Sequence, residues 1–352
     1  MAVNKAFWQG RRVLVTGHTG FKGSWMSLWL ERLGAQVWGL SLPPYTEPNH
    51  FDLLGLERRM QHRVGDIRDR ALVRDVVAEA APEVIFHMAA QPIVALGWRD
   101  PQGTFATNVM GTIHVLEAAL ECPSLRAALV ITSDKVYANP NDGVAFTEDS
   151  PLGGEDPYSA SKAATEMAVR AFHAPFAARG LGLASARAGN VIGGGDWSAH
   201  RIVTDLARAA AAGTVPVLRR PNSVRPWQHV LEPLSGYLRF AARLVEKPDG
   251  APAALNFGPP PEDCRTVAEL AEAFAARYPY SPAWQDGGES IGLEAGLLTI
   301  ASDAAHRELG WSPRLDFKAT IDWTAEWYAA HNAGADMPAL SLAQLERFGL
   351  EP

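Results

Sequence analysis

A tyrosine and a lysine stand four residues apart at Tyr158 and Lys162, in the stretch Asp156-Pro-Tyr-Ser-Ala-Ser-Lys162. The residues that follow have helical spacing, and on a helix positions i and i+4 share one face. A phenol loses its proton near pH ~10, and a neighbouring cation favours the phenolate. The pair therefore predicts a general base, Tyr158, that works close to neutral pH. An exposed tyrosine and lysine at a helix start is the structural alternative.

A glycine-rich turn follows the first apolar run of the chain. Residues 11–16 are short, apolar and rich in β-branched side chains, which predicts a buried strand. Gly17, Gly20 and Gly23 come next, ahead of apolar residues at helical spacing. This order indicates a dinucleotide-binding turn, because glycines let the backbone approach a pyrophosphate at the helix N-terminus.

The alternation of strands and helices continues through the first half of the chain. Further strands are predicted at residues 36–40, 62–66, 84–88, 127–132 and 183–188, and helices at residues 69–80 and 100–120. Such alternation predicts an α/β fold with a Rossmann-type, doubly wound parallel sheet. Because ligands of these sheets bind beyond the carboxyl ends of the strands, we expect Asp66, residues 89–91 and residues 132–135 to surround one crevice.

The adenosine end of this site is less clearly defined than the phosphate end. The second strand is followed by Ser41, where an acidic residue usually holds the ribose hydroxyls of NAD. No arginine stands beside Ser41 to accept the 2′-phosphate of NADP.

The second half of the chain has a different character. Residues 1–188 are predicted to form the dinucleotide-binding domain. Residues 189–352 are predicted to form mainly a smaller C-terminal α/β substrate lobe, with late segments at about 229–258 returning to the sheet. Arginines in this lobe are spaced so that several could reach one diphosphate.

Composition limits the function classes. The 352 residues carry a net charge of -7 without a basic block, which argues against nucleic-acid binding, and contain no apolar run long enough to span a membrane. The two cysteines, Cys122 and Cys264, and the polar start of the chain predict a reducing cytoplasm. The histidines are scattered, so we expect no metal site.

Taken together, these motifs resemble the extended short-chain dehydrogenase/reductase superfamily. The shared motifs are Gly17-x-x-Gly20-x-x-Gly23, Asp66-Ile67, His87-Met-Ala-Ala90, Asn108 and Tyr158-x-x-x-Lys162. Within its nucleotide-sugar branch, longer stretches closely resemble the CDP-glucose 4,6-dehydratases. These stretches are residues 17–25, 87–92, 131–135, 188–197 and 223–236.

The resemblance implies conversion of CDP-D-glucose to CDP-4-dehydro-6-deoxy-D-glucose and water, by internal hydride transfer from C4 to C6 through NAD. It implies Tyr158 as the base for the O4 proton, Lys162 as the partner of the phenolate and Ser133 as a hydrogen-bond partner of O4. It also implies Asp134 as the acid for the leaving hydroxyl. Lys135 stands where thymidine-linked dehydratases carry a glutamate, and we expect it to remove the C5 proton.

The resemblance also implies binding residues. Those expected to hold NAD are Gly17, Thr19, Gly20, Phe21, Lys22, Gly23, Asp66, Ile67, Ala89, Ala90, Gln91, Asn108, Tyr158 and Lys162. Those expected to bind CDP-glucose or a related nucleotide sugar are Asn190, Arg201, Arg219 and Arg225. Related proteins pair the helices that correspond to residues 100–120 and 158–179, so we expect a homodimer or a dimer of dimers.

Two other functions fit part of the pattern. Another nucleotide-sugar dehydratase, or a 4-epimerase, would share Tyr158 and Lys162, although an epimerase does not require Asp134 and Lys135. A non-enzymatic NAD(P)-binding sensor or scaffold would use the same fold. The intact set of Ser133, Tyr158 and Lys162 argues against that third class.

Overall fold

The computed structural model describes residues 3–278, 284–287 and 298–349. Within these residues, seven parallel strands form the central sheet in the order β11-β6-β5-β4-β1-β2-β3. Their bounds are β1 (Arg12–Thr16), β2 (Gln36–Ser41), β3 (Gln61–Val64), β4 (Val84–His87), β5 (Ala127–Ile131), β6 (Gly182–Arg187) and β11 (Ala254–Asn256). The sheet confirms the Rossmann-type, doubly wound architecture predicted from the sequence.

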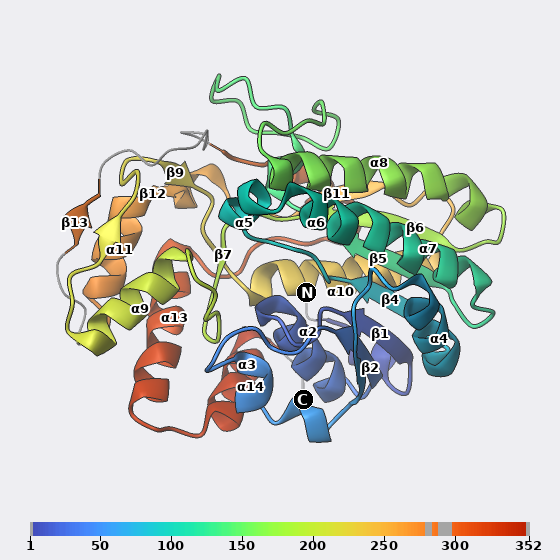
Figure 1. Cartoon of the computed structure of the whole chain (residues 1–352), viewed down its shortest axis with the longest axis horizontal. Coiled ribbons are helices and arrows are strands. Elements are labelled where there is room, and N and C mark those ends of the chain that lie inside the picture. The colour runs from blue at the N-terminus through green and yellow to red at the C-terminus, as the bar shows by residue number, and fades with distance from the viewer. Residues whose placement is uncertain (1–2, 279–283, 288–297, 350–352) are drawn as a thin grey trace.

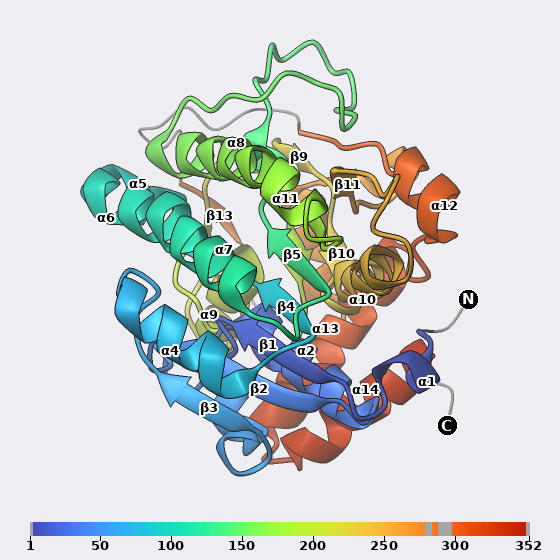
Figure 2. The ribbon, with the colours of Figure 1, turned by 90° about the vertical axis from the view of Figure 1, so that its right-hand side faces the viewer.

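Helices cover both faces of the sheet (Figures 1 and 2). On one face lie α4 (Arg70–Ala80), α7 (Gly111–Glu121) and α8 (Pro157–Ala177), and on the other lie α2 (Phe21–Arg32) and α10 (Leu231–Glu246). Successive strand residues point to opposite faces, so Val13 and Val15 join the core under α2 and α10 while Leu14 joins the core under α4, α7 and α8. Burial on both faces explains why the central strands β4 and β5 are almost entirely apolar, whereas β3 at the sheet edge is polar and largely exposed.

A second group of elements lies beside the carboxyl edge of the sheet, on the left in Figure 1. Its helices are α9 (Ile202–Ala212), α11 (Val267–Ala275) and α13 (Phe317–Asn332), and α11 packs against both others. Its short strand pairs are β7 (Val191–Ile192) with β10 (Gln228–His229), β9 (Val224–Arg225) with β12 (Arg265–Thr266), and β8 (Val217–Leu218) with β13 (Gln285–Asp286). From within this half of the chain, β11 returns to the edge of the large sheet beside β6.

The segment predicted as one helix over residues 100–120 is interrupted. It consists of α6 (Pro101–Phe105), a π-helical turn η2 (Ala106–Met110) and then α7. Such turns widen a helix and are frequent at functional sites. Here the π turn carries Asn108, one of the expected cofactor residues.

Shorter elements complete the described chain. They are α1 (Lys5–Trp8), α3 (His50–Leu53), η1 (Leu56–Arg58), α5 (Val94–Arg99), η3 (Asp134–Val136), η4 (Pro261–Asp263), α12 (Asp303–Leu309) and α14 (Met337–Phe348). None of the helices in the described ranges has the length and apolar character needed to cross a bilayer.

Candidate active site

Helix α8 fixes Tyr158 and Lys162 at the carboxyl end of β5. The carboxylate of Asp156 caps the helix by accepting a hydrogen bond from the Ser159 N–H at 3.0 Å, and Pro157 occupies the first turn. Tyr158 and Lys162 are both buried. The Lys162 ammonium donates to the carbonyl oxygen of Ile131, the last residue of β5, at 3.2 Å. The cap and this bond hold the pair beside the strand end.

Ser133, Asp134 and Lys135 follow β5 after Thr132, and Ser133 and Asp134 lie close enough to act on Tyr158. Ser133 shares a hydrogen bond with the Tyr158 side chain. The Ser133 hydroxyl also donates to Asp134 Oδ1 at 3.1 Å and accepts from the Lys135 N–H at 3.2 Å. Asp134 is 2% exposed, and its Oδ2 has no hydrogen-bond partner within the described residues. The structure thus brings four of the five predicted catalytic side chains together at a buried strand end, with Lys135 half-buried beside them.

The protonation state of Tyr158 differs from the expectation. Burial raises the pKa of the Tyr158 hydroxyl, and the hydrogen bond with Ser133 and the charge of Arg201 only partly oppose this. The prediction that Lys162 brings the pKa of Tyr158 toward neutrality is therefore wrong for the free protein. The physical reason is that desolvation of the phenolate outweighs the nearby cations, and the Lys162 ammonium is bonded to Ile131 instead.

Positive charge is concentrated in the same place. Burial and the nearby ammonium of Lys22 lower the pKa of Lys162 to about 8. Burial and the guanidinium of Arg201 lower the pKa of Lys22 to about 8, against the opposing carboxylates of Asp134 and Asp196. Mutual repulsion of this kind indicates a place where an anionic ligand is stabilised.

The glycine turn fits the pyrophosphate of a dinucleotide. Gly17 has φ +76°, and a Cβ there would lie 2.7 Å from the Ala89 nitrogen. A Cβ on Gly23 would lie 2.1 Å from the Gly17 carbonyl oxygen. Only glycine permits this close packing. The first-turn N–H groups of α2, those of Phe21 and Lys22 among them, have no partner within the helix, as at any helix start. Such N–H groups at a helix N-terminus bind phosphate, so the turn can hold NAD.

Hydrogen bonds connect the residues expected to hold the cofactor after β4 to the π turn and to α8. The Gln91 N–H donates to the Asn108 side-chain oxygen at 2.8 Å, and the Asn108 amide donates to the Ser161 hydroxyl at 2.8 Å. These bonds tie the Ala89–Gln91 segment after β4 to the catalytic helix. Near the expected adenosine end, the hydroxyls of Thr19 and Ser41 lie 2.8 Å apart and share a hydrogen bond.

Asp66 already has a partner in the free protein. The Arg68 guanidinium donates to Asp66 Oδ2 at 2.6 and 2.8 Å, and this hydrogen bonding lowers the pKa of the carboxyl. Ile67, next to it, is buried against Gly111 of α7. Asp66 therefore remains an ionised acceptor at the carboxyl end of β3.

The four expected substrate residues come from the part of the chain that runs from the end of β6 to β9. Arg201 acts electrostatically on both Tyr158 and Lys22, which places it beside the catalytic side chains. Arg225 is 6% exposed in β9, and Asn190 follows β6 with φ +29°. Arg219 is exposed, and its positive charge acts on the carboxyl of Asp205 in α9.

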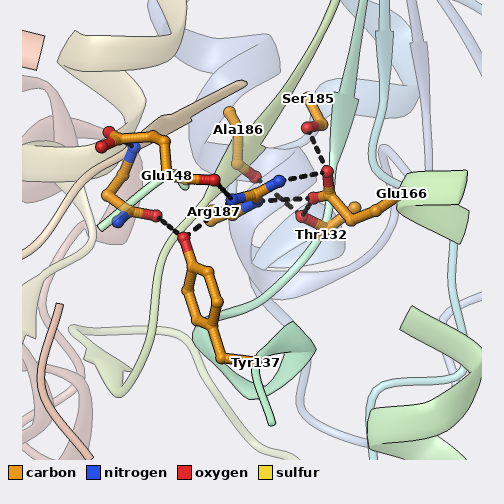
Figure 3. Close-up of polar contacts among 8 residues, drawn as sticks. Thr132, Tyr137, Glu148, Glu166, Ser185, Ala186 and Arg187 are labelled. Atoms are coloured by element: carbon orange, nitrogen blue, oxygen red, sulfur yellow. Dashed lines mark hydrogen bonds and ion pairs between the residues drawn. The ribbon is translucent and has the colours of Figure 1, made fainter. Parts of the chain in front are cut away.

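Sequence reasoning did not identify a buried ion pair beneath the site (Figure 3). Glu166 lies one helical turn after Lys162, and its carboxylate accepts from the Arg187 guanidinium at 2.8 and 3.0 Å. The side chains are 4% and 5% exposed. A charged residue inside the otherwise small and apolar strand of residues 182–187 was the available signal, because a buried charge requires a partner.

A glycine next to the predicted acid was also missed. A Cβ on Gly189 would lie 1.7 Å from Asp134 Oδ2. The Gln228 side chain donates to the Gly189 carbonyl oxygen at 3.2 Å and to the Phe257 carbonyl oxygen at 2.8 Å. Gly189 thus lies directly against the Asp134 carboxylate, and Gln228 holds the Gly189 carbonyl in place.

Comparison with known proteins shows the family of the chain. Residues 13–258 match the model of the NAD dependent epimerase/dehydratase family. The chain is 42% identical to a CDP-glucose 4,6-dehydratase of Salmonella typhimurium over 98% of both chains, and 29% identical to a dTDP-glucose 4,6-dehydratase of Xanthomonas campestris over 96% of this chain and 98% of the relative.

Solved structures share the fold. A dTDP-glucose 4,6-dehydratase of Streptomyces venezuelae with NAD bound superimposes with a TM-score of 0.77 at 24% identity, covering 92% of this chain and 98% of the other. A UDP-glucose 4-epimerase of Thermotoga maritima gives a TM-score of 0.80 at 21% identity, covering 91% and 99%. The chain therefore belongs to the NAD-dependent epimerase/dehydratase family.

Proposed function

We propose that this protein is a CDP-glucose 4,6-dehydratase, a hydro-lyase that converts CDP-D-glucose to CDP-4-dehydro-6-deoxy-D-glucose and water. The observation that carries the proposal is the meeting of Ser133, Asp134 and Lys135 with Tyr158 and Lys162 at one strand end. The near full-length similarity to the Salmonella typhimurium CDP-glucose 4,6-dehydratase supports the same substrate.

NAD, when bound, accepts a hydride from sugar C4 and returns it to C6, so the reaction has no net redox change. Tyr158 is assigned the removal of the O4 proton, and Ser133 shares the hydrogen bond at that oxygen. Because burial raises the pKa of Tyr158 in the free protein, the phenolate must form after ligands bring further stabilisation. Lys162 would supply part of it and would hold the ribose next to the nicotinamide.

Elimination of water is assigned to Asp134 and Lys135. A neutral Lys135 amine removes the proton from C5, and a protonated Asp134 carboxyl gives a proton to the C6 hydroxyl, which leaves as water. When C6 receives the hydride, the Lys135 ammonium returns its proton to C5, and the Asp134 carboxylate regains the proton that Tyr158 took from O4, so every group ends as it began. Both elimination residues stand in the short segment between β5 and Tyr137, next to Ser133, which shares a hydrogen bond with Tyr158; in this assignment they act on the same sugar as Tyr158.

The diphosphate of the substrate is assigned to Arg225, Asn190 and Arg201. Arg225 is the most buried of these, and its guanidinium already donates to the Val224 carbonyl oxygen at 2.9 Å, so the diphosphate would be a further partner suited to its planar fork of donors. Arg219 is assigned to the solvent-exposed edge of the proposed substrate site.

The proposed assembly is a homodimer, or a dimer of dimers, and the proposed compartment is the cytoplasm. Exposed apolar side chains on α5, α6, η2 and α8 support the first proposal, among them Trp98, Phe105, Met110 and Met167. The free thiols of Cys122 and Cys264 support the second, because thiols persist in reducing compartments.

The test is incubation of the purified protein and NAD with CDP-glucose, UDP-glucose and dTDP-glucose in parallel. We expect the alkali-induced chromophore of a 4-keto-6-deoxy sugar from CDP-glucose, without net absorbance growth at 340 nm. Faster turnover of another nucleotide sugar would assign that substrate instead. Epimerised sugar without a 4-keto product would identify an epimerase, and no reaction with any of them would favour a sensor or scaffold.

A further inference from the structure

The Glu166 carboxylate is fully satisfied by four hydrogen bonds. Oε1 accepts from the Thr132 hydroxyl at 2.5 Å and from Arg187 Nε at 3.0 Å. Oε2 accepts from the Ser185 hydroxyl at 2.6 Å and from Arg187 Nη2 at 2.8 Å. Glu166 thereby joins the catalytic helix α8 to the ends of β5 and β6 (Figure 3).

The remaining guanidinium nitrogen extends the network to the far side of the catalytic segment. Arg187 Nη1 donates to the Tyr137 hydroxyl at 2.8 Å and to the Glu148 carbonyl oxygen at 3.2 Å. The Tyr137 hydroxyl in turn donates to the Asn256 side-chain oxygen on β11 at 2.7 Å. Figure 3 shows Arg187 between Glu166 and Tyr137.

The positions of these residues in the chain show which segments the network holds. Thr132 immediately precedes the segment Ser133–Lys135, and Tyr137 follows it after one residue. The segment is therefore held at both ends. Glu166 lies two helical turns after Tyr158 and one after Lys162, so the same network also holds the helix that carries the other two residues.

Stability alone is a weak reason for such a network. A buried ion pair gains little over well-packed apolar side chains, because both charges lose their hydration. A network that fixes geometry has a different value, since a displacement of about 1 Å in a reacting group can cost about 10² in rate. Burial raises the pKa of Tyr137 to about 12, so its hydroxyl stays a neutral donor throughout the working pH range.

We propose that Glu166, Arg187 and Tyr137 are positioning residues that align the elimination residues Asp134 and Lys135 with the oxidation residues Tyr158 and Lys162. Glu166 anchors the helix side, and Tyr137 anchors the far end of the elimination segment. This inference rests on the proposed function. It requires that loss of the Tyr137 anchor impairs elimination while leaving oxidation intact.

The test is the Tyr137→Phe variant, which removes one oxygen atom. The ring keeps its stacking on Phe146, at 4.9 Å between centroids, and the Glu166–Arg187 pair stays whole. With CDP-glucose we expect kcat to fall by about 10- to 10²-fold with little change in KM. During steady turnover we expect bound cofactor to accumulate in the reduced form at 340 nm, and less deuterium from D₂O at sugar C5.

The matched control is Tyr278→Phe. Tyr278 is also buried, and its hydroxyl also bonds an asparagine, Asn332, but in the second group of elements. This variant should lose a similar amount of stability in thermal unfolding without changing the steady-state cofactor spectrum. If both variants behave alike, Tyr137 has only a structural role and the inference is overturned.

Two further measurements separate the possible failures. If Tyr137→Phe does not fold, Asn256→Ala removes the acceptor on the far side of the Tyr137 hydroxyl, and it should shift the cofactor spectrum in the same direction; an unchanged spectrum would overturn the inference. If the parent protein gives no 4-keto product from CDP-glucose, the proposed function itself fails. Lys135→Met, in which the C5 base is absent, supplies the reference spectrum for blocked elimination.

Discussion

Asp134 has no room to move toward Gly189. A methyl group on Gly189 would lie 1.7 Å from Asp134 Oδ2, far inside the closest approach of two non-bonded atoms. We therefore predict that Gly189→Ala displaces the proposed acid and lowers kcat for CDP-glucose by about 10²-fold, the cost of a displacement of about 1 Å. CDP binding measured by calorimetry should change little, because Arg225 is not displaced.

A second glycine supplies the control for that experiment. A methyl group on Gly250, in the loop between α10 and β11, meets no atom within 4 Å. Gly250→Ala has its own backbone strain, because Gly250 has φ +69°, but it should leave kcat unchanged. Parent-like turnover by folded Gly189→Ala would mean that Asp134 is not the acid of the reaction.

At the same scale, the sequence allowed the position of Tyr158 and Lys162 to be predicted but not their ionisation. Their meeting depends only on helical spacing, which is local. The pKa of Tyr158 depends on how completely the fold removes it from water, and that is a tertiary property. The pairing of Glu166 with Arg187 could not be predicted from the sequence for the same reason, because it depends on which strand ends lie beside α8.

At the scale of elements, the strands of the large sheet were predictable to within about two residues, because burial on both faces gives most of them, such as β4 and β5, an apolar run. The two-residue strands of the second group were not, since tertiary contacts and not local patterns create them. The π turn at Asn108 also left no signal. Its side chain is held by Gln91 and Ser161, which are distant in sequence.

Helix α10 contains a buried carboxyl with a predictable effect on stability. Glu232 Oε1 accepts from the backbone N–H groups of Arg314 and Leu315 at 2.9 and 2.7 Å, while Oε2 has no partner within the described residues. Burial raises the pKa of Glu232 from 4.5 to about 7, against these hydrogen bonds. Between these values the folded state binds more protons than the unfolded state, so this group's stabilising contribution, complete below pH 4.5, is lost as the pH rises through 7.

We predict that Glu232→Gln removes this dependence. The variant should gain stability relative to the parent between pH 5 and pH 8, by on the order of 1 to 3 kcal/mol, because one pKa unit corresponds to about 1.4 kcal/mol. Urea unfolding at both pH values measures the difference. Glu269→Gln is the control: hydrogen bonds from Thr266 lower the pKa of that exposed carboxyl, so its own pH dependence lies below pH 4.5 and the variant should keep the parent's slope between pH 5 and pH 8. A parent-like pH slope in Glu232→Gln would contradict the assignment.

At the scale of the whole molecule, one side carries apolar side chains that no described element covers. Trp98 is 54% exposed on α5, Met110 is 47% exposed on η2, and Met167 is 57% exposed on α8. These elements lie side by side with α7 along one face (Figure 1). A stable interface buries about 800 Å² on each partner around an apolar centre, and a two-fold axis lets one face serve both copies.

We predict that the protein sediments as a dimer or a multiple of a dimer at micromolar concentration, and that Trp98→Asp combined with Met167→Asp shifts it to monomer. Each substitution would place a carboxylate at the apolar centre of the interface, where desolvation is not repaid. Val144→Asp is the control, because Val144 is 67% exposed and lies in the loop after η3, on none of the helices that carry these side chains. Analytical ultracentrifugation measures the oligomeric state of each protein.

A monomeric parent would contradict the predicted dimer. An unchanged dimer in the double variant would place the interface on another face. A monomeric variant that keeps its CDP-glucose turnover would show that each active site is complete within one chain, as the convergence of Ser133 and Tyr158 within one subunit implies.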